Sequence, residues 1–504
     1  MEILGWRIFP LITLLISIFL FYINTSSKPS NSLCTLLPYD RYWLVSKQIV
    51  TPEGVISGAV EIKGGTIASV VEGVYQQGGI IKGHVVDYGN AVVMPGLIDV
   101  HVHLDDPGRA EWEGFSTGTK AAAAGGITTL IDMPLNSEPS TVSVDTLKLK
   151  VEAAEEKIYV DVGFWGGLVP ENAFNFTTLD GLLKAGVLGL KSFMCPSGIN
   201  DFPMTNISHI KEGLHVLAKY KRPLLVHAEM ELDSESGLKA TDGIDDARSY
   251  STYLKTRPPA WEEAAIRALL EVTKHTRPGG SAEGSHLHVV HLSDAKASLN
   301  LIKEAKRSGD SITVETCPHY LAFSAEGIPD GDTRFKCSPP IRDAENREQL
   351  WGALMEGHID MLSSDHSPSV PELKLFGEGN FLKAWGGISS LQYVLPVTWS
   401  YGKKYGITLN QFASWWSERP AKLAGQELKG AIRSGNYADI VVWEPDTEFE
   451  LDENHTAYHK NPSISAYLGT KLSGKVLATY VRGSLVFNGA KHAPAACGVT
   501  ILAK

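Results

Sequence analysis

The chain has 504 residues and a formal net charge of −11 at pH 7, with 46 lysine and arginine residues against 57 aspartate and glutamate residues. No run of basic residues stands out, which argues against nucleic acid or an anionic membrane surface as the main partner. The hydrophobic share of 43% is ordinary for a globular protein, and the length exceeds that of one small domain. The five cysteines are scattered and form no Cys-x-x-Cys motif, so we expect neither a disulfide framework nor a thiolate zinc site.

The N-terminal segment differs from the rest of the chain in composition. Residues 8–23 form a run of sixteen uncharged, mostly apolar residues that follows Arg7 and precedes a serine-rich polar linker. Signal-peptide cores have roughly 7–15 such residues and membrane spans about 20. The run predicts a secretory signal or signal-anchor within residues 1–35, and therefore a location in the endoplasmic reticulum or secretory pathway, with membrane contact only through this segment. The alternative is a buried core helix, although the polar linker argues against packing.

Two segments with the pattern of short strands flank the central part of the chain. Residues 38–94 and 431–504 alternate apolar and polar positions between glycines, which is typical of β-structure. Each segment is too small to form a good core alone. We therefore expect both segments to pair into one small composite β-sandwich domain.

Residues 95–430 have a different pattern, in which eight apolar strand-like runs alternate with helical stretches. This alternation indicates parallel strands joined by crossover helices. Eight such units predict an α/β fold, a (β/α)8 TIM barrel with insertions. The runs are LIDVHVHL, GITTLIDM, YVDVGFWGGL, GLKSFM, PLLVHAE, HLHVVHLS, SITVETCP and HIDMLSSD.

The first run, LIDVHVHL, carries two histidines on one face of the expected strand. His101 and His103 are separated by one residue, so their side chains point the same way about 7 Å apart along the strand. That spacing allows both imidazoles to bind one metal ion. Taken alone, the pattern is more often structural, with each histidine bonded to a backbone group.

Four further polar residues lie near the ends of later runs: Lys191, His227, His291 and Asp365. Each has an ordinary explanation, such as a solvent-reaching lysine or a helix-capping aspartate. Barrel active sites, however, collect side chains from the C-terminal ends of several strands. Four histidines and an aspartate placed in this way suffice for a dinuclear site with nitrogen and oxygen ligands. The lysine does not fit such a site, because an ammonium group is a cation without a lone pair.

These motifs together resemble those of the cyclic amidohydrolases, the group in the amidohydrolase superfamily that includes dihydroorotase, hydantoinase/dihydropyrimidinase and allantoinase. The resemblance covers about residues 43–487. Residues 107–142 and the stretch AWGGISSLQ (384–392) are most similar to the allantoinase branch, and to its plant members in particular. The motifs that carry the resemblance are PGLIDVHVHL, GLKSF, VHAE, VHLS, ETCPHYL, FKCSPPIR and SSDHSP.

The resemblance implies two divalent metal ions per subunit, bridged by a lysine that CO2 has carboxylated to N6-carboxylysine. This modification of Lys191 removes the misfit, since it turns a cation into an anion with two oxygen ligands. The family favours zinc, with manganese, iron or cobalt as alternatives. The implied metal ligands are His101, His103, Lys191, His227, His291 and Asp365.

The resemblance also implies the reaction. A hydroxide that bridges the metals would open the ring of allantoin at its cyclic amide bond and give allantoate, a step of purine catabolism. Asp365 would act as the catalytic base and then as the acid. A homo-oligomer, dimer or tetramer, is expected. The implied substrate-binding residues are Asn136, Ser192, Ser338, Gly386 and Gly387.

The residue after the HxHL motif bears on the choice of substrate. Dihydroorotases carry an arginine there that holds a substrate carboxylate, whereas this chain has Asp105. An aspartate would repel an anion but is compatible with neutral allantoin, and a solvated loop aspartate is the alternative interpretation. Two other functions stay open: a hydantoinase or dihydropyrimidinase, and a non-catalytic scaffold relative. The complete set of ligand positions argues against the scaffold.

Overall fold

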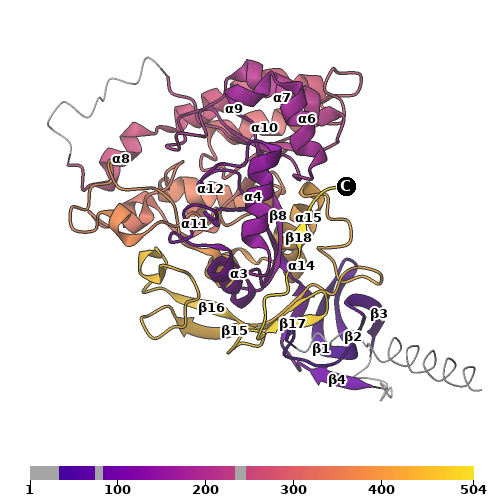
Figure 1. Ribbon diagram of the computed structural model, residues 1–504. Coiled ribbons are helices and arrows are strands. Elements are labelled where there is room, and N and C mark those ends of the chain that lie inside the picture. Colours follow the sequence, from indigo (N-terminus) through magenta and orange to yellow (C-terminus); the bar gives the residue numbers. More distant parts are fainter. Residues whose placement is uncertain (1–32, 74–82, 233–245) are drawn as a thin grey trace, which may run out of the picture.

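All eight apolar runs contain a strand of a parallel barrel in the computed structural model, which describes residues 33–73, 83–232 and 246–504 (Figure 1). These strands are buried along nearly their whole length, as expected for parallel strands that helices cover. A parallel bridge between Val102 and His366 links the first strand to the segment after the last one. The strands are β6 (Leu97–Val102), β7 (Ile127–Asp132), β8 (Asp161–Phe164), β10 (Leu190–Phe193), β11 (Pro223–His227), β12 (His286–Val289), β13 (Ile312–Thr316) and β14 (Met361–Leu362), with the short β9 (Gly166–Gly167) beside β10.

Helices follow the strands and cover the barrel from outside (Figure 1). In α7, for example, Asn206 caps the first turn by accepting a hydrogen bond from the His209 amide. Ile210, Leu214 and Leu217 then recur at helical spacing and pack against β11 and β12. The helices are α3 (Phe115–Ala124), α4 (Val144–Ala154), α5 (Pro170–Ala173), α6 (Phe176–Lys184), α7 (Ile207–Ala218), α8 (Tyr250–Thr256), α9 (Pro259–Thr273), α10 (Ala297–Arg307), α11 (Pro318–Ala322), α12 (Ala344–Met355), α13 (Val394–Gly402), α14 (Leu409–Ala413) and α15 (Arg419–Leu423).

The two flanking segments form one eight-stranded sheet, as their composition predicts. The junction is the antiparallel pairing of β5 with β15, in which Pro95 lies opposite Ile440. Both segments contribute to one apolar core, so neither has to bury its apolar face alone. The strands are β1 (Arg41–Thr51), β2 (Gly54–Lys63), β3 (Thr66–Glu72), β4 (His84–Asp87), β5 (Val92–Pro95), β15 (Ile440–Glu450), β16 (Lys471–Val481) and β17 (Ser484–Phe487).

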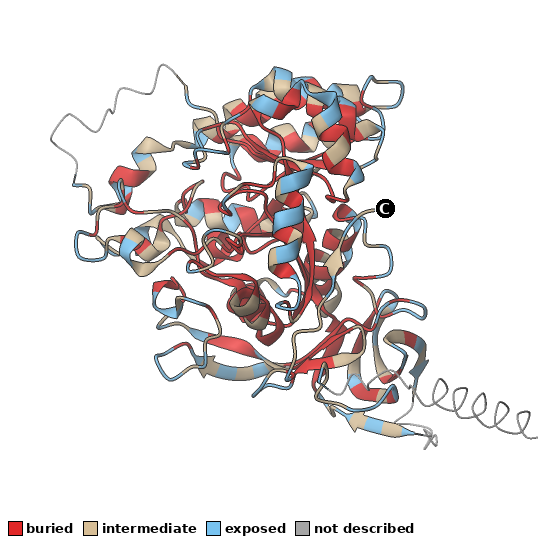
Figure 2. Ribbon diagram, viewed as in Figure 1, coloured by how far each residue is buried: buried red, intermediate tan, exposed pale blue. Residues whose placement is uncertain are grey.

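The C-terminal tail differs from the expected domain division. The segment predicted to belong wholly to the small domain, 431–504, ends in β18 (Thr500–Ile501). This strand pairs in parallel with β8 and so extends a sheet of the barrel. Two residues that pair with a distant strand leave no periodic signal in the sequence, which explains the difference. Figure 2 shows the resulting distribution of burial, with buried residues in the barrel strands and exposed ones on the outer faces of helices such as α4.

The expectation for the cysteines needs a correction. Cys34 and Cys497 form a disulfide, with their Cα atoms 5.4 Å apart although 463 positions separate them in sequence. The other three cysteines, Cys195, Cys317 and Cys337, are free and buried. Cysteine spacing could not indicate the bond, because only the folded chain brings its N- and C-terminal segments together. The disulfide joins residues 33–37 to the C-terminal tail between β17 and β18. A separate contact holds the same segment to the composite sheet, since the Leu36 amide donates to the Leu485 carbonyl.

The localisation prediction also needs a correction. Residues 8–23, on which it depended, lie outside the residues that the structure describes. Within 33–73, 83–232 and 246–504, no helix has the length and apolar character needed to cross a membrane. The run itself is shorter than the roughly 20 residues that a span requires. The predicted membrane-anchored location in the endoplasmic reticulum is therefore wrong on this finding, and we withdraw it.

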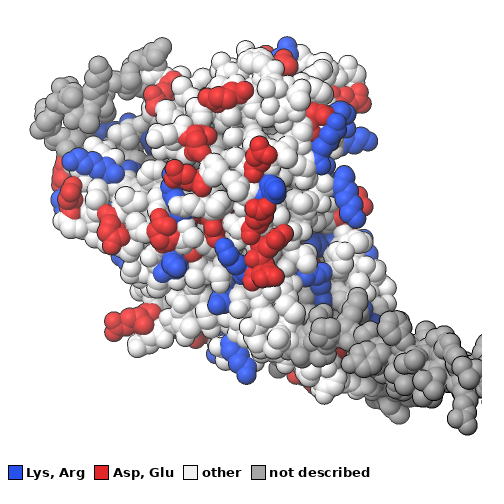
Figure 3. Space-filling model, viewed as in Figure 1, with Lys and Arg blue, Asp and Glu red and all other residues white. Residues whose placement is uncertain are grey.

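Acidic and basic side chains are interspersed on the molecular face drawn in Figure 3. Among the described residues on that face, no continuous basic patch is present. A phosphate backbone binds through such a patch, and the described residues on this face do not form one.

Candidate metal centre and active site

The six predicted metal ligands come from five barrel strands and lie at the C-terminal end of the barrel. Strands β6, β10 and β11 carry ligands within the strand or one residue beyond it, whereas β12 and β14 place them in the following loop. All six side chains are buried, with at most 8% of a residue exposed. The residues are His101 and His103 on β6, Lys191 on β10, His227 on β11, His291 after β12 and Asp365 after β14.

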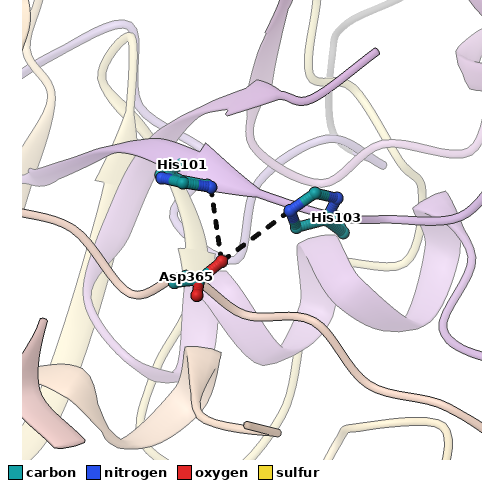
Figure 4. A group of neighbouring side chains, drawn as sticks. All are labelled: His101, His103 and Asp365. Atoms are coloured by element: carbon teal, nitrogen blue, oxygen red, sulfur yellow. Dashed lines mark ion pairs between the residues drawn. The ribbon is translucent and has the colours of Figure 1, made fainter. Parts of the chain in front are cut away.

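Three of these side chains converge on one point, as Figure 4 shows. His101 Nε2 lies 3.3 Å from Asp365 Oδ1, and His103 Nε2 lies 3.7 Å from the same oxygen. Two ligand atoms that bind one tetrahedral metal at about 2.1 Å each are about 3.4 Å apart. The three residues therefore have the donor types and the spacing of a metal site.

A second pair of histidines lies next to this group. The rings of His227 and His291 are 4.5 Å apart, and the rings of His291 and His101 are 5.2 Å apart. Burial lowers the pKa of His227 to about 4, as it does for His101, so both rings are neutral at pH 7 and can offer a lone pair. The second pair can therefore hold a second metal ion beside the first.

Lys191 lies fully buried between the histidines and Asp365, and Nζ has no hydrogen-bond partner among the described residues. The centroid of the Phe193 ring lies 4.9 Å from Lys191 Nζ. Burial lowers the pKa of Lys191 to about 8, against the opposing effect of Asp365 and Glu315. A buried ammonium without a partner is costly. The buried position therefore disfavours a free ammonium group at Lys191.

Two buried glutamates that sequence reasoning missed hold the histidines in place. His101 Nδ1 lies 2.7 Å from Glu315 Oε1, and His227 Nε2 lies 2.6 Å from Glu229 Oε2. Burial would raise the pKa of Glu315, but hydrogen bonds from His101 and His288 hold it below its ordinary value. Each ionised carboxylate accepts a hydrogen bond from one ring N–H of its histidine. The other ring nitrogen then stays free to bind a metal. The only signal in the sequence was their place in ETCPHYL and VHAE.

We predict that Glu229→Gln lowers metal affinity about 10–100-fold, because the neutral amide no longer fixes the tautomer of His227. Metal titration of the apo-protein measures the change. Glu263→Gln is the control, since Glu263 pairs with the exposed Arg267 one turn further along α9. Equal metal affinity of the two variants would contradict an orienting role for Glu229.

Backbone strain is concentrated at the same site. His291 and Asp365 have positive φ angles of 39° and 45°, a region that side-chain-bearing residues rarely adopt. Such conformations cost about 1–3 kcal/mol each and persist where the surrounding structure imposes them. Both residues stand in loops just after a strand, where this backbone turns their side chains back over the barrel end.

A cavity of about 1030 Å³ opens above the cluster. Four of the five predicted substrate-binding residues line it: Asn136, Ser338, Gly386 and Gly387. Ser192 does not, since it is fully buried and its hydroxyl lies 2.6 Å from that of Thr205. Sequence reasoning also missed several lining residues, namely Tyr253, Arg257, Lys336 and Trp385. Two of them, Lys336 and Trp385, lie inside the quoted stretches FKCSPPIR and AWGGISSLQ.

Asp105 lies buried behind the cavity wall and is not one of the lining residues. Neither carboxylate oxygen has a hydrogen-bond partner among the described residues, and its φ is 61°. Burial, reinforced by Asp132 and Glu113, raises its pKa well above the ordinary value. The structure thus excludes a solvated loop aspartate and gives no support to direct substrate contact.

Comparison with known proteins decides the family. Residues 92–486 match the amidohydrolase family, and residues 37–91 match the composite domain of allantoinase. The chain belongs to the amidohydrolase family. Within this family it is 69% identical to the allantoinase of Arabidopsis thaliana, over 100% of this chain and 99% of that protein, and 67% identical to a probable allantoinase of Oryza sativa, over 94% and 92%.

Solved structures of other amidohydrolases share the fold at lower identity. The L-hydantoinase of Arthrobacter aurescens superposes with a TM-score of 0.81 at 27% identity, over 92% of this chain and all of that one. The dihydropyrimidinase of Brevibacillus agri gives 0.79 at 28% identity, with the same coverage. The allantoinases are thus far more similar in sequence than these hydantoinases. The predicted barrel with a composite domain is confirmed.

Proposed function

We propose that this amidohydrolase opens the ring of allantoin at its cyclic amide bond and releases allantoate. The observation that carries the proposal is the convergence of four histidines and an aspartate on the wall of one cavity, with Lys191 fully buried nearby. The high identity to plant allantoinases across the whole chain supports allantoin as the substrate. The expected dimer or tetramer stays a prediction.

The side chains fit two divalent metal ions. His101, His103 and Asp365 would hold one ion, and His227 and His291 the other. The buried atoms His103 Nδ1, His291 Nδ1 and Lys191 Nζ lack hydrogen-bond partners in the described parts of the chain, which marks a polar site that its protein atoms do not satisfy by themselves. Such ions, once bound, polarise a carbonyl and lower the pKa of water. Zinc, manganese, iron and cobalt all suit these ligands.

We further propose that Lys191 carries a carboxylate on Nζ. The neutral amine attacks the carbon of CO2, a C–N bond forms, and the nitrogen releases one proton. The product is an anion whose two oxygens can each contact one half of the ligand cluster. The buried, unpartnered Nζ and the neighbouring histidines support this modification.

Asp365 is the proposed proton carrier. Its carboxylate faces the cavity and lies within 3.7 Å of the ring nitrogens of both β6 histidines. Without bound metal, burial raises the pKa of Asp365 to about 8, with Lys191 opposing the shift. It would take the proton of the attacking water and deliver it to the leaving ring nitrogen.

We predict that purified, metal-loaded protein hydrolyses allantoin at least about 100-fold more efficiently than hydantoin or dihydrouracil, because a site with matched polar groups rejects substrates that lack them. The measurement compares kcat/KM for the three compounds together with metal content per chain. Equal or better activity on dihydrouracil would instead favour a dihydropyrimidinase. A metal-free protein without any ring hydrolysis would favour the scaffold.

A further inference from the structure

Two buried lysines lie behind the 382–387 loop, outside the proposed metal cluster. Lys374 is fully buried at the end of a short 3-10 helix, and Lys336 is 9% exposed. Within the part of the chain that the structure describes, neither ammonium forms an ion pair with a carboxylate. Burial lowers the pKa of Lys374 to about 7 and that of Lys336 to about 8. Buried lysines without an acidic partner are costly, so their contacts need an explanation.

Both ammonium groups bind backbone carbonyls of this one loop. Lys374 Nζ donates to the Gly387 carbonyl at 2.6 Å and to the Trp385 carbonyl at 3.2 Å. Lys336 Nζ donates to the Ala384 carbonyl at 2.6 Å and to the Leu382 carbonyl at 3.2 Å. Four carbonyls of the loop are therefore turned toward the two lysines.

The orientation of the Trp385 carbonyl also fixes the direction of the Gly386 N–H, because both belong to one peptide unit. A trans peptide is planar, and its C=O and N–H point in opposite directions. Because the Trp385 carbonyl points to Lys374, the Gly386 N–H points away from it. The Gly387 amide is already bound to the Lys336 carbonyl, whereas no acceptor for the Gly386 amide exists among the described residues. Since Gly386 lines the cavity, its N–H is a free donor for a bound molecule.

The loop also fits tightly against the segment that carries Asp365. Gly387 has a φ of 120°, and a Cβ atom there would lie 1.9 Å from the Ser367 carbonyl oxygen. The Ser367 amide donates to the Ile388 carbonyl at 3.1 Å. The Gly386 N–H is thus held at a fixed position relative to the carboxylate of Asp365.

We infer that Lys336 and Lys374 are positioning residues that hold the 382–387 loop so that the Gly386 N–H donates a hydrogen bond to a carbonyl oxygen of the cyclic amide substrate. This inference rests on the proposed function. Allantoin has carbonyl groups in its ring and in its ureido tail, and each can accept such a bond. Lys374 does not line the cavity and acts through the loop alone. Lys336 lines the cavity, but in this role it acts through its two hydrogen bonds to the loop carbonyls.

The test is the steady-state kinetics of Lys374→Met and Lys336→Met, which keep the side-chain volume and remove the donors. We expect KM for allantoin to rise about tenfold, with kcat within about threefold and metal content unchanged. Lys306→Met is the control, since Lys306 donates to the His358 carbonyl and pairs with Asp360 at the opposite end of the barrel. Its KM should stay that of the parent. If Lys374→Met does not fold, KM for allantoin of Lys336→Met alone tests the inference.

A double-mutant cycle separates positioning from general destabilisation. Gly386→Pro removes the proposed donor, so Lys374→Met added to Gly386→Pro should raise KM no further than Gly386→Pro alone. Fully additive effects, or an unchanged KM in both lysine variants, would overturn the inference. An inactive parent protein would overturn the proposed function instead. Should the parent prefer hydantoin, the same variants are measured on hydantoin, whose carbonyls can accept the same bond.

Discussion

Lys191→Ala is expected to lose most of its metal and to lower kcat/KM for allantoin by at least about 1,000-fold. The reason is the place of Lys191, which is fully buried and close enough to all four histidines for its charge to lower their pKa. Without a bridging anion, two dications held side by side repel each other in a site of low dielectric constant. Metal analysis and initial rates on the purified variant measure both effects.

A chemical rescue sharpens this prediction. Alanine leaves a space where the lysine chain and its carboxylate would be, and a short carboxylic acid such as acetate or propionate can enter it. Millimolar concentrations should restore part of the metal content and part of the activity. Lys148→Ala is the control, because this side chain is 75% exposed on α4 and does not line the cavity. Full metal occupancy in Lys191→Ala without added acid would refute the bridging role.

Asp365→Asn is expected to lower kcat by about 100- to 10,000-fold, which is the usual contribution of a general acid or base to the rate. The amide has the same shape and can still bind a metal weakly through its oxygen, but it cannot accept a proton. The loss should therefore exceed any loss of metal, and rates normalised to metal content measure it. Asp343→Asn is the matched control, since Asp343 caps α12 and asparagine caps a helix equally well.

The pH dependence offers a second readout for Asp365. With its pKa raised by burial, the carboxyl of the metal-free site is largely protonated below about pH 8, and bound cations would shift its titration to lower pH. The parent enzyme should lose activity toward acidic pH as the base becomes protonated, and Asp365→Asn should lack this decline. Activity of the variant within about tenfold of the parent would exclude the base assignment.

Much of the fold could be predicted because parallel barrels leave a strong local pattern. A strand covered on both faces has to be apolar along its length, so runs such as GITTLIDM and PLLVHAE are visible without any structure. All eight runs contain a barrel strand, and the two flanking segments share one sheet. The strand pairing of Thr500–Ile501 and the disulfide of Cys34 were not predictable, since both join positions hundreds of residues apart.

The candidate site, like the fold, could be predicted in part from the sequence. The chain itself determined which residue types stand at the strand ends, because a residue near the C-terminal end of a barrel strand points to the shared cavity regardless of the rest of the fold. Only the tertiary structure could show that Glu315 and Glu229 orient two of the histidines, that Ser192 is bonded to Thr205, and that Asp105 is buried.

The physical reason is the range of the interactions involved. Apolar periodicity and strand-end position are local properties that each segment carries by itself, so the sequence alone determined the barrel, the composite sheet and the set of candidate ligands. Hydrogen-bond partners, burial and the direction of a backbone amide depend on which distant segments meet. Those contacts, including the two lysines behind Gly386, were decided only when the chain folded.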